Sequence, residues 1–88
     1  MNQREALRET IELARANGMD NCTSDIPELD FPHLVSMYDR IIAADVTSTP
    51  FSEAKIGRWL GWAQAAVVVH GEASLEDMKA LNMKWSDK

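Results

Sequence analysis

The chain has 88 residues, of which 45% are hydrophobic and 26% charged, and its formal net charge is −5. A chain this short buries only about 60% of the surface that its unfolded form exposes, so we expect one domain with a modest core. The acidic balance argues against nucleic-acid binding, which ordinarily needs a basic excess.

The single cysteine and the lengths of the apolar runs narrow the class of protein and the compartment in which we expect it. Cys22 is the only cysteine, which excludes an internal disulfide, and the spacing of Cys and His fits no zinc site. The first residues lack the apolar core of a signal peptide, and the longest nearly apolar run, residues 59–69, is too short to span a bilayer. We expect a cytoplasmic protein with no membrane span, no cofactor and no metal.

The N-terminal part of the chain predicts one helix followed by a loop. Leu7, Ile11 and Ala14 have helical spacing and place the first helix within residues 1–18. Gly18 stands where a left-handed cap is commonest. Residues 19–29 are rich in turn formers and predict a loop, so residues 30–88 are left to form the helical core.

Residues 30–46 carry the clearest amphipathic pattern. Asp30 is a suitable N-cap, and Pro32 is tolerated in a first turn. A 3.6-residue period joins the apolar positions that follow, which are Phe31, Leu34, Val35, Tyr38, Ile41, Ile42 and Asp45 or Val46.

Two further helices are predicted after residues 47–50 break this pattern. The third runs over about 51–70, with Thr49 or Ser52 as its cap and Gly71 at its end. Ser74 and Asp77 have capping-box spacing and open a short fourth helix, with Leu75, Met78, Leu81 or Asn82, and Trp85 on one face. We therefore expect an all-α single domain over residues 1–88, a compact bundle of about four helices around the third.

The third helix is apolar on nearly all sides. Ile56, Leu60, Ala63 and Val67 form one stripe, and the mostly small residues Ala54, Gly57, Gly61, Ala65 and Val68 form a second, more than about 100° away at 100° per residue. Each glycine costs a helix about 1 kcal/mol relative to alanine, which close contact with another helix would offset. We assign helix packing to Gly57, Gly61, Ala65 and Trp59.

Two interpretations of this helix stay open. In one, the other three helices clamp it on all sides. In the other, the edge that holds Lys55, Arg58 and Trp62 remains available as an interaction surface, because Trp and Arg are the residue types most enriched at binding hot spots.

The candidate catalytic groups do not form a motif. His33 and His70 lie on different helices, and Cys22 has no His near it in the sequence. The loose acidic cluster of residues 20–30 lacks the alternating spacing and glycine of a calcium loop. We assign no catalytic, cofactor or metal residue, and an enzyme would need His33, His70 or Cys22 to converge with carboxylates in a pocket.

The alternative is a helix-turn-helix-like transcriptional regulator formed by the third helix, the turn and the fourth helix. Its would-be recognition helix begins with Glu76 and Asp77, where phosphate contacts are needed. The alternative therefore requires a joint basic face of Lys55, Arg58, Lys79 and Lys84.

The run from Phe51 to Ala66, followed by Gly71 and residues 74–79, resembles a group of short, largely uncharacterised bacteriophage and prophage proteins. They share an Arg-Trp-Leu-Gly-aromatic-x-Gln signature, here residues 58–64, before a glycine turn and a short acidic-start helix. The likeness covers residues 31–83. It implies a phage origin and the host cytoplasm, and it transfers no catalytic residue.

These observations predict a small non-enzymatic phage accessory protein that acts by protein–protein interaction. Its expected partner is a host or phage protein, with a homodimer as a second possibility and the blocking or redirecting of a host factor or defence system as the expected role.

Overall fold

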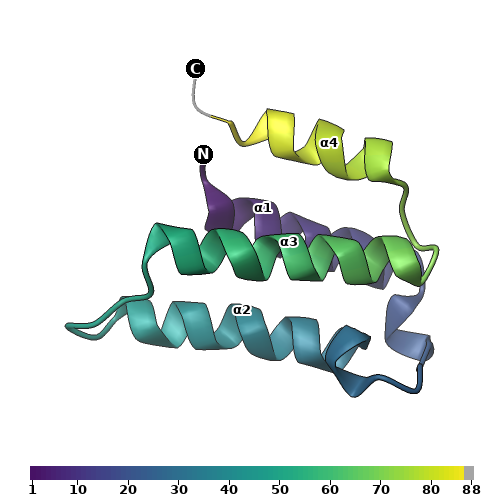
Figure 1. The fold of residues 1–88 in the computed structure, drawn as a ribbon, viewed down its shortest axis with the longest axis horizontal. Coiled ribbons are helices and arrows are strands. Elements are labelled where there is room, and N and C mark those ends of the chain that lie inside the picture. Colours follow the sequence, from purple (N-terminus) through teal and green to yellow (C-terminus); the bar gives the residue numbers. More distant parts are fainter. Residues whose placement is uncertain (87–88) are drawn as a thin grey trace.

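The computed structural model describes residues 1–86, which form an all-α bundle without a strand. The helices are α1 (Gln3–Ala16), α2 (Phe31–Asp45), α3 (Glu53–Val69) and α4 (Leu75–Lys84), with two 3₁₀ turns, η1 (Met19–Asn21) and η2 (Pro27–Leu29), between α1 and α2. The fold class predicted from the sequence is confirmed (Figure 1).

The helix ends follow the capping signals of the sequence, with one exception. The Ser52 hydroxyl accepts a hydrogen bond from the Lys55 backbone at 3.1 Å, and Ser74 forms a reciprocal capping box with Asp77. Gly18 has φ +92°, a conformation that side chains other than glycine rarely adopt. Asp30 precedes α2 as predicted, but its carboxylate makes no cap bond because it binds Ser24 instead.

The core contains most of the predicted faces of the four helices, but Leu75, predicted to share a face with Met78 and Leu81 in α4, is exposed because no helix of the described chain covers the start of α4. The stripe of Ile56, Leu60, Ala63 and Val67 is buried as expected. In α2, Met37 takes a core position that the pattern missed, whereas Ile42 and Val46 are exposed. The buried apolar residues are Ala6, Leu7, Ile11, Ala14, Met19, Phe31, Leu34, Met37, Ile41, Ile56, Leu60, Ala63, Ala66, Val67, Met78 and Leu81.

The helices are not equally covered. In Figure 1, α3 lies between α2 and α4, but α1 is the helix that packs against all three others. Helices α3 and α4 make little direct backbone contact. One flank of α3 therefore stays without the cover that its apolar circumference requires.

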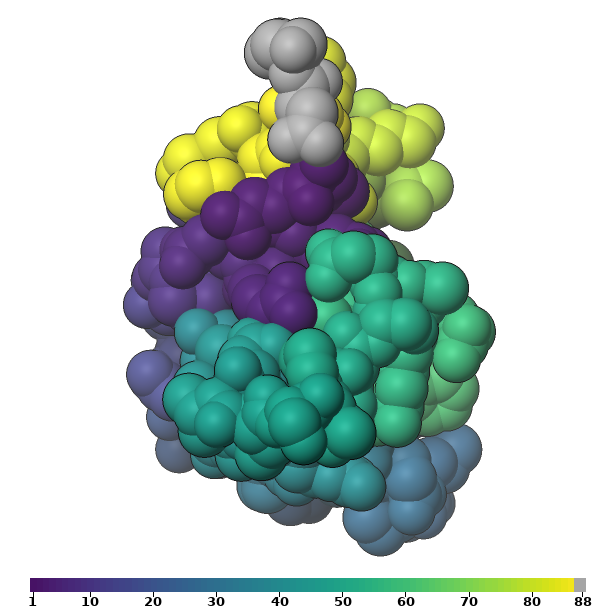
Figure 2. Space-filling view, turned by 90° about the vertical axis from the view of Figure 1, so that its left-hand side faces the viewer, coloured from purple at the N-terminus to yellow at the C-terminus, as the bar shows by residue number. Residues whose placement is uncertain are grey.

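The N-terminal end of α1 is held from two sides, as Figure 2 shows. The Arg4 guanidinium binds Asp45 at 2.6 Å and Glu53 at 3.0 Å, which joins α1 to the end of α2 and the start of α3. On the other side, the Asn2 backbone N–H donates to the Trp85 carbonyl at 2.9 Å.

A buried polar network fastens α4 to the bundle. The side-chain amides of Gln64 and Asn82 exchange two hydrogen bonds, at 2.8 and 3.0 Å. Gln64 also donates to the hydroxyl of Thr10 at 3.2 Å, and that hydroxyl donates to the Ala6 carbonyl. Three helices thus meet at one glutamine, and buried polar groups satisfied in this way fix a single arrangement.

Replacing Gln64 by alanine should lower the free energy of unfolding by about 1–3 kcal/mol, because the Asn82 amide and the Thr10 hydroxyl lose a partner. Urea unfolding of Q64A measures this loss. The exposed helical substitution Ser36→Ala is the control and should stay within about 0.5 kcal/mol of the wild type. An equal stability of Q64A and S36A would contradict the proposed role of the network.

Candidate functional site

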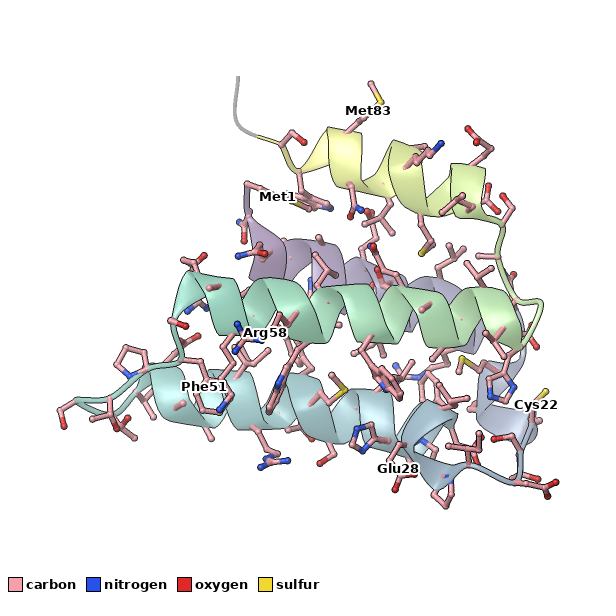
Figure 3. All side chains as sticks on the ribbon, in the orientation of Figure 1. Met1, Cys22, Glu28, Phe51, Arg58 and Met83 are labelled. Atoms are coloured by element: carbon pink, nitrogen blue, oxygen red, sulfur yellow. The ribbon has the colours of Figure 1, made fainter. Side chains whose placement is uncertain are left out.

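A groove of about 360 Å³ lies between α2 and α3, with η2 at one end. Figure 3 shows Phe51 and Arg58 near one end of this boundary and Glu28 toward the other. The groove brings two residues of the sequence-predicted interaction surface, Arg58 and Trp62, together with residues of α2. Its lining consists of Glu28, His33, Met37, Arg40, Arg58, Trp59 and Trp62.

Trp62 is the residue that makes this groove distinctive. Its side chain is 45% exposed, yet its indole N–H donates to the Glu28 carbonyl at 2.9 Å. The ring is therefore held in one place while a large part of it faces solvent. An aromatic side chain already fixed before binding loses little further conformational entropy when a partner covers it.

Trp59 lies deeper and joins the groove to the core. It is half-buried and packs edge-on against Phe51, with ring centroids 5.1 Å apart. Two cations lie over its ring, since the Arg40 guanidinium is 5.3 Å and the Lys55 ammonium 5.2 Å from the centroid. Lys55 also lies 3.9 Å from the centre of the Phe51 ring. Such cation–π contacts position the cations without neutralising them.

Among the described residues, the cations at this groove lack an ion pair, as does Arg15, which lies over the Phe31 ring outside the groove. Within residues 1–86, no carboxylate lies within ion-pair distance of Arg40, Lys55 or Arg58, whereas Arg4 binds two carboxylates. The other paired cations are Arg8, Lys79 and Lys84. An acidic chain thus carries a local basic and aromatic surface at the boundary of α2 and α3.

A second groove, of about 410 Å³, lies between α3 and α4 on the other flank of α3 and is mostly apolar. It holds Gly61 and Ala65, and its rim includes Val69 and Leu75, which are 69% and 61% exposed. A Cβ added at Gly61 would meet no atom within 4 Å. No helix of the described chain covers this part of the small-residue stripe, so packing of Gly61 and Ala65 against a partner stays a prediction.

Gly57 differs from Gly61. A Cβ at Gly57 would lie 2.6 Å from the side-chain oxygen of Gln3, whose amide nitrogen donates to the Glu53 carbonyl at 2.9 Å. The first glycine of the pair therefore admits a side chain of α1, and the second faces open space.

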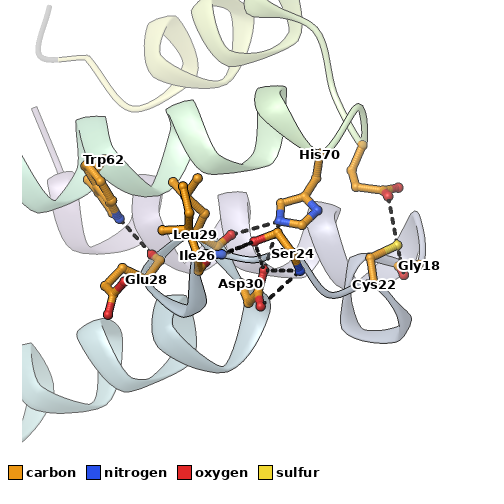
Figure 4. A network of polar contacts seen from close by, with 10 residues as sticks. Gly18, Cys22, Ser24, Ile26, Glu28, Leu29, Asp30, Trp62 and His70 are labelled. Atoms are coloured by element: carbon orange, nitrogen blue, oxygen red, sulfur yellow. Dashed lines mark hydrogen bonds and ion pairs between the residues drawn. The ribbon is translucent and has the colours of Figure 1, made fainter.

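The loop before α2 is closed by a carboxylate (Figure 4). Asp30 accepts hydrogen bonds from the backbone N–H and hydroxyl of Ser24, and it lies 3.3 Å from the Nε2 atom of His70. His70 also contacts the Leu29 carbonyl at 3.0 Å. The hydrogen bonds from Ser24 are the largest of the effects that lower the pKa of Asp30.

The geometry of these contacts is that of a group that holds the loop closed. The Ser24 hydroxyl donates to Asp30, whereas an activated serine needs its hydroxyl on the histidine. Cys22 donates to the carboxylate of Glu72 at 3.6 Å, and partial burial together with that carboxylate raises the pKa of the thiol. A raised pKa leaves less thiolate, the reactive form, at neutral pH.

Residues 1–86 hold neither a cluster of metal ligands nor a membrane-spanning helix. They contain no group of three His, Cys, Asp or Glu side chains placed to hold a metal ion. None of their helices combines the length and the apolar character that crossing a membrane requires.

The basic face required by the helix-turn-helix alternative is divided. Arg58 lines the α2–α3 groove, whereas Lys79 lines the α3–α4 groove on the other flank of α3. Lys79 also pairs with Glu76, and Lys84 pairs with Glu9. Arg40, which the sequence argument did not include, joins Arg58 instead.

No protein-family model, curated protein or solved structure matches the chain.

Asp30 should give the protein a measurable acid sensitivity. Because folding lowers its pKa, the stabilisation from Asp30 is present above the unfolded value of about 3.9 and is lost as the pH falls toward the folded value. The melting temperatures of wild type and Asp30→Asn should differ most near pH 6 and converge below about pH 4. A difference that is constant across this range would contradict the assignment.

The two helical glycines should respond differently to alanine. Gly61→Ala should stabilise the monomer by about 1 kcal/mol, because the helix gains propensity and the methyl group meets nothing. Gly57→Ala should gain less, because it displaces Gln3 from its bond to Glu53. Chemical denaturation of both variants at low protein concentration makes the comparison, and a destabilised G61A would contradict the exposed placement of Gly61.

Proposed function

We propose that this protein is a small non-enzymatic accessory protein that acts by protein–protein contact through the α2–α3 groove. The observation that carries the proposal is Trp62, a large ring that is 45% exposed and yet fixed by its bond to Glu28. Arg58 lies beside it, exposed and without an ion pair in the described part of the chain. Fixed aromatic rings next to arginine are the usual anchors of protein interfaces.

Trp62 stabilises the monomer less than a core tryptophan does. A core tryptophan contributes roughly 3–5 kcal/mol to stability. Trp62 is 45% exposed, so the monomer obtains only part of that contribution, and a partner that covers the residue supplies more of it. The groove is thus better suited to binding than to stabilising the chain.

We also propose an origin and a site of action for this protein. The signature at residues 58–64 supports a phage or prophage origin, and with it a site of action in the host cytoplasm. The size of the chain and the aromatic groove between α2 and α3 suit a protein that blocks or redirects a host factor, including a defence system.

Self-association is a second candidate, favoured by the α3–α4 groove. Gly61 lowers helix stability, and a Cβ added there would meet no atom within 4 Å, while Val69 and Leu75 expose apolar surface beside it. A second copy seated there would use the glycine for close backbone approach. The G61A variant separates the two effects, since its added methyl group should stabilise the monomer and weaken such a dimer.

Trp62→Ala should abolish partner capture while the fold survives. The variant loses the bond to Glu28 and part of the buried ring, so its stability should fall by less than the roughly 3–5 kcal/mol of a core aromatic. Affinity for a captured partner should fall at least about thirtyfold, as for a hot spot of about 2 kcal/mol. Pull-down from host lysate followed by binding measurements with the purified partner tests both expectations.

The matched control is Met83→Ala, which removes a side chain that is 69% exposed and points away from the bundle on α4 (Figure 3). M83A should capture the partner as the wild type does. Equal loss in both variants, or capture that survives in W62A, would overturn the proposed site. Salt-dependent binding of duplex DNA would favour the transcriptional regulator instead.

A further inference from the structure

The charge at the α2–α3 groove specifies the chemistry of its partner, and this inference rests on the proposed function. The net charge of the chain is −5, yet Arg40, Lys55 and Arg58 gather at one boundary without a carboxylate partner among residues 1–86. Of the other described cations, Arg4, Arg8, Lys79 and Lys84 each pair with an acid, and Arg15 lies over the Phe31 ring without an ion pair. Among residues 1–86, this boundary is where three cations without an ion pair lie together.

We propose that the groove binds an acidic polypeptide segment that carries an aromatic or aliphatic side chain. The apolar side chain packs against the exposed ring of Trp62, and flanking carboxylates bind Arg58 and Arg40. Arginine suits this role because its planar guanidinium can form two parallel hydrogen bonds with one carboxylate. Lys55, held over Phe51 and Trp59, provides a further positive charge at the same boundary.

Local charge decides this recognition despite the acidic character of the whole chain. At physiological ionic strength, exposed charges further apart than about 8 Å are largely screened from one another. A carboxylate seated in the groove therefore experiences Arg40 and Arg58 more strongly than the distant acids of α1. Glu28 is the acid that lines the groove, and it disfavours a second anion at the η2 end.

The same geometry disfavours a nucleic acid as the occupant. A polynucleotide presents one phosphate per residue and needs a continuous track of cations. The groove is about 360 Å³, contains Glu28, and holds two arginines in its lining. That volume accommodates a few side chains, and the charges match one or two carboxylates.

The test uses a displayed library of short random peptides selected on the immobilised full-length protein. Peptides that bind the wild type but not Arg58→Glu should be enriched in Asp and Glu beside an aromatic or aliphatic residue. When one of the selected peptides is synthesised, R58E should lower the affinity of the protein for it at least about tenfold. Lys79→Glu is the control, because it makes the same change in net charge at the α3–α4 groove, and it should leave the affinity within about twofold.

Each other outcome overturns the inference in a recognisable way. Enrichment of basic or neutral peptides, or no enrichment, would contradict the acidic partner. If a partner is captured through Trp62 but an acidic peptide that binds the protein does not displace it, the proposed function stands while the inference fails. Preferential binding of a single-stranded oligonucleotide of matched charge would point to a nucleic acid. An equal effect of K79E and R58E would show that net charge, and not this groove, governs binding.

Discussion

Helix α3 carries more apolar surface than the rest of this short chain can cover. Its stripe of Ile56, Leu60, Ala63 and Val67 is buried, but the helix is also apolar on flanks that lie more than about 100° from that stripe. Helices α1 and α2 pack against it, whereas α4 makes little direct backbone contact with it. The two larger grooves of the described residues, the α2–α3 groove and the α3–α4 groove, both lie along α3.

The polar contacts determine which flanks stay open. Gln64 on α3 binds Asn82 of α4 and Thr10 of α1. A separate bond from the Asn2 N–H to the Trp85 carbonyl joins the residue before α1 to the residue after α4. The bond from Asn2 holds α4 against the start of α1, and the Gln64–Asn82 pair joins α4 to α3, yet the part of α3 around Gly61 is left uncovered. On the opposite flank, Asp30 and His70 close the loop before α2 and set η2 where its carbonyl reaches Trp62. The stability of the bundle and the shape of its grooves therefore rest on the same few hydrogen bonds.

The fold was largely predictable because local signals agree with the final structure. The capping box at Ser74, the glycine after α1 and the 3.6-residue periods define the helices through short-range physics. The burial of Met37 and the role of Gln64 were not predictable, since each depends on which helix lies opposite. An amide within an apolar run gives no sign in the sequence that its partners are Thr10 and Asn82.

The candidate site was predictable only in part for the same reason. Arg58 and Trp62 stood out as an unusual pair on one helix edge, whereas Arg40 and Glu28 join them through tertiary packing. Residues 19–29 were expected to be a loop, and the helical turn η2 that completes the groove lies within them. Its signal, a proline after Ile26, is compatible with many turns.

Chemical-shift mapping of the isotope-labelled protein with its captured partner tests the central claim most directly. The account predicts that the largest changes fall on the indole N–H of Trp62, the side chains of Arg40 and Arg58, and the backbone of η2. Changes confined to the exposed face of α1 or to α4, with the Trp62 indole signal unmoved, would contradict it.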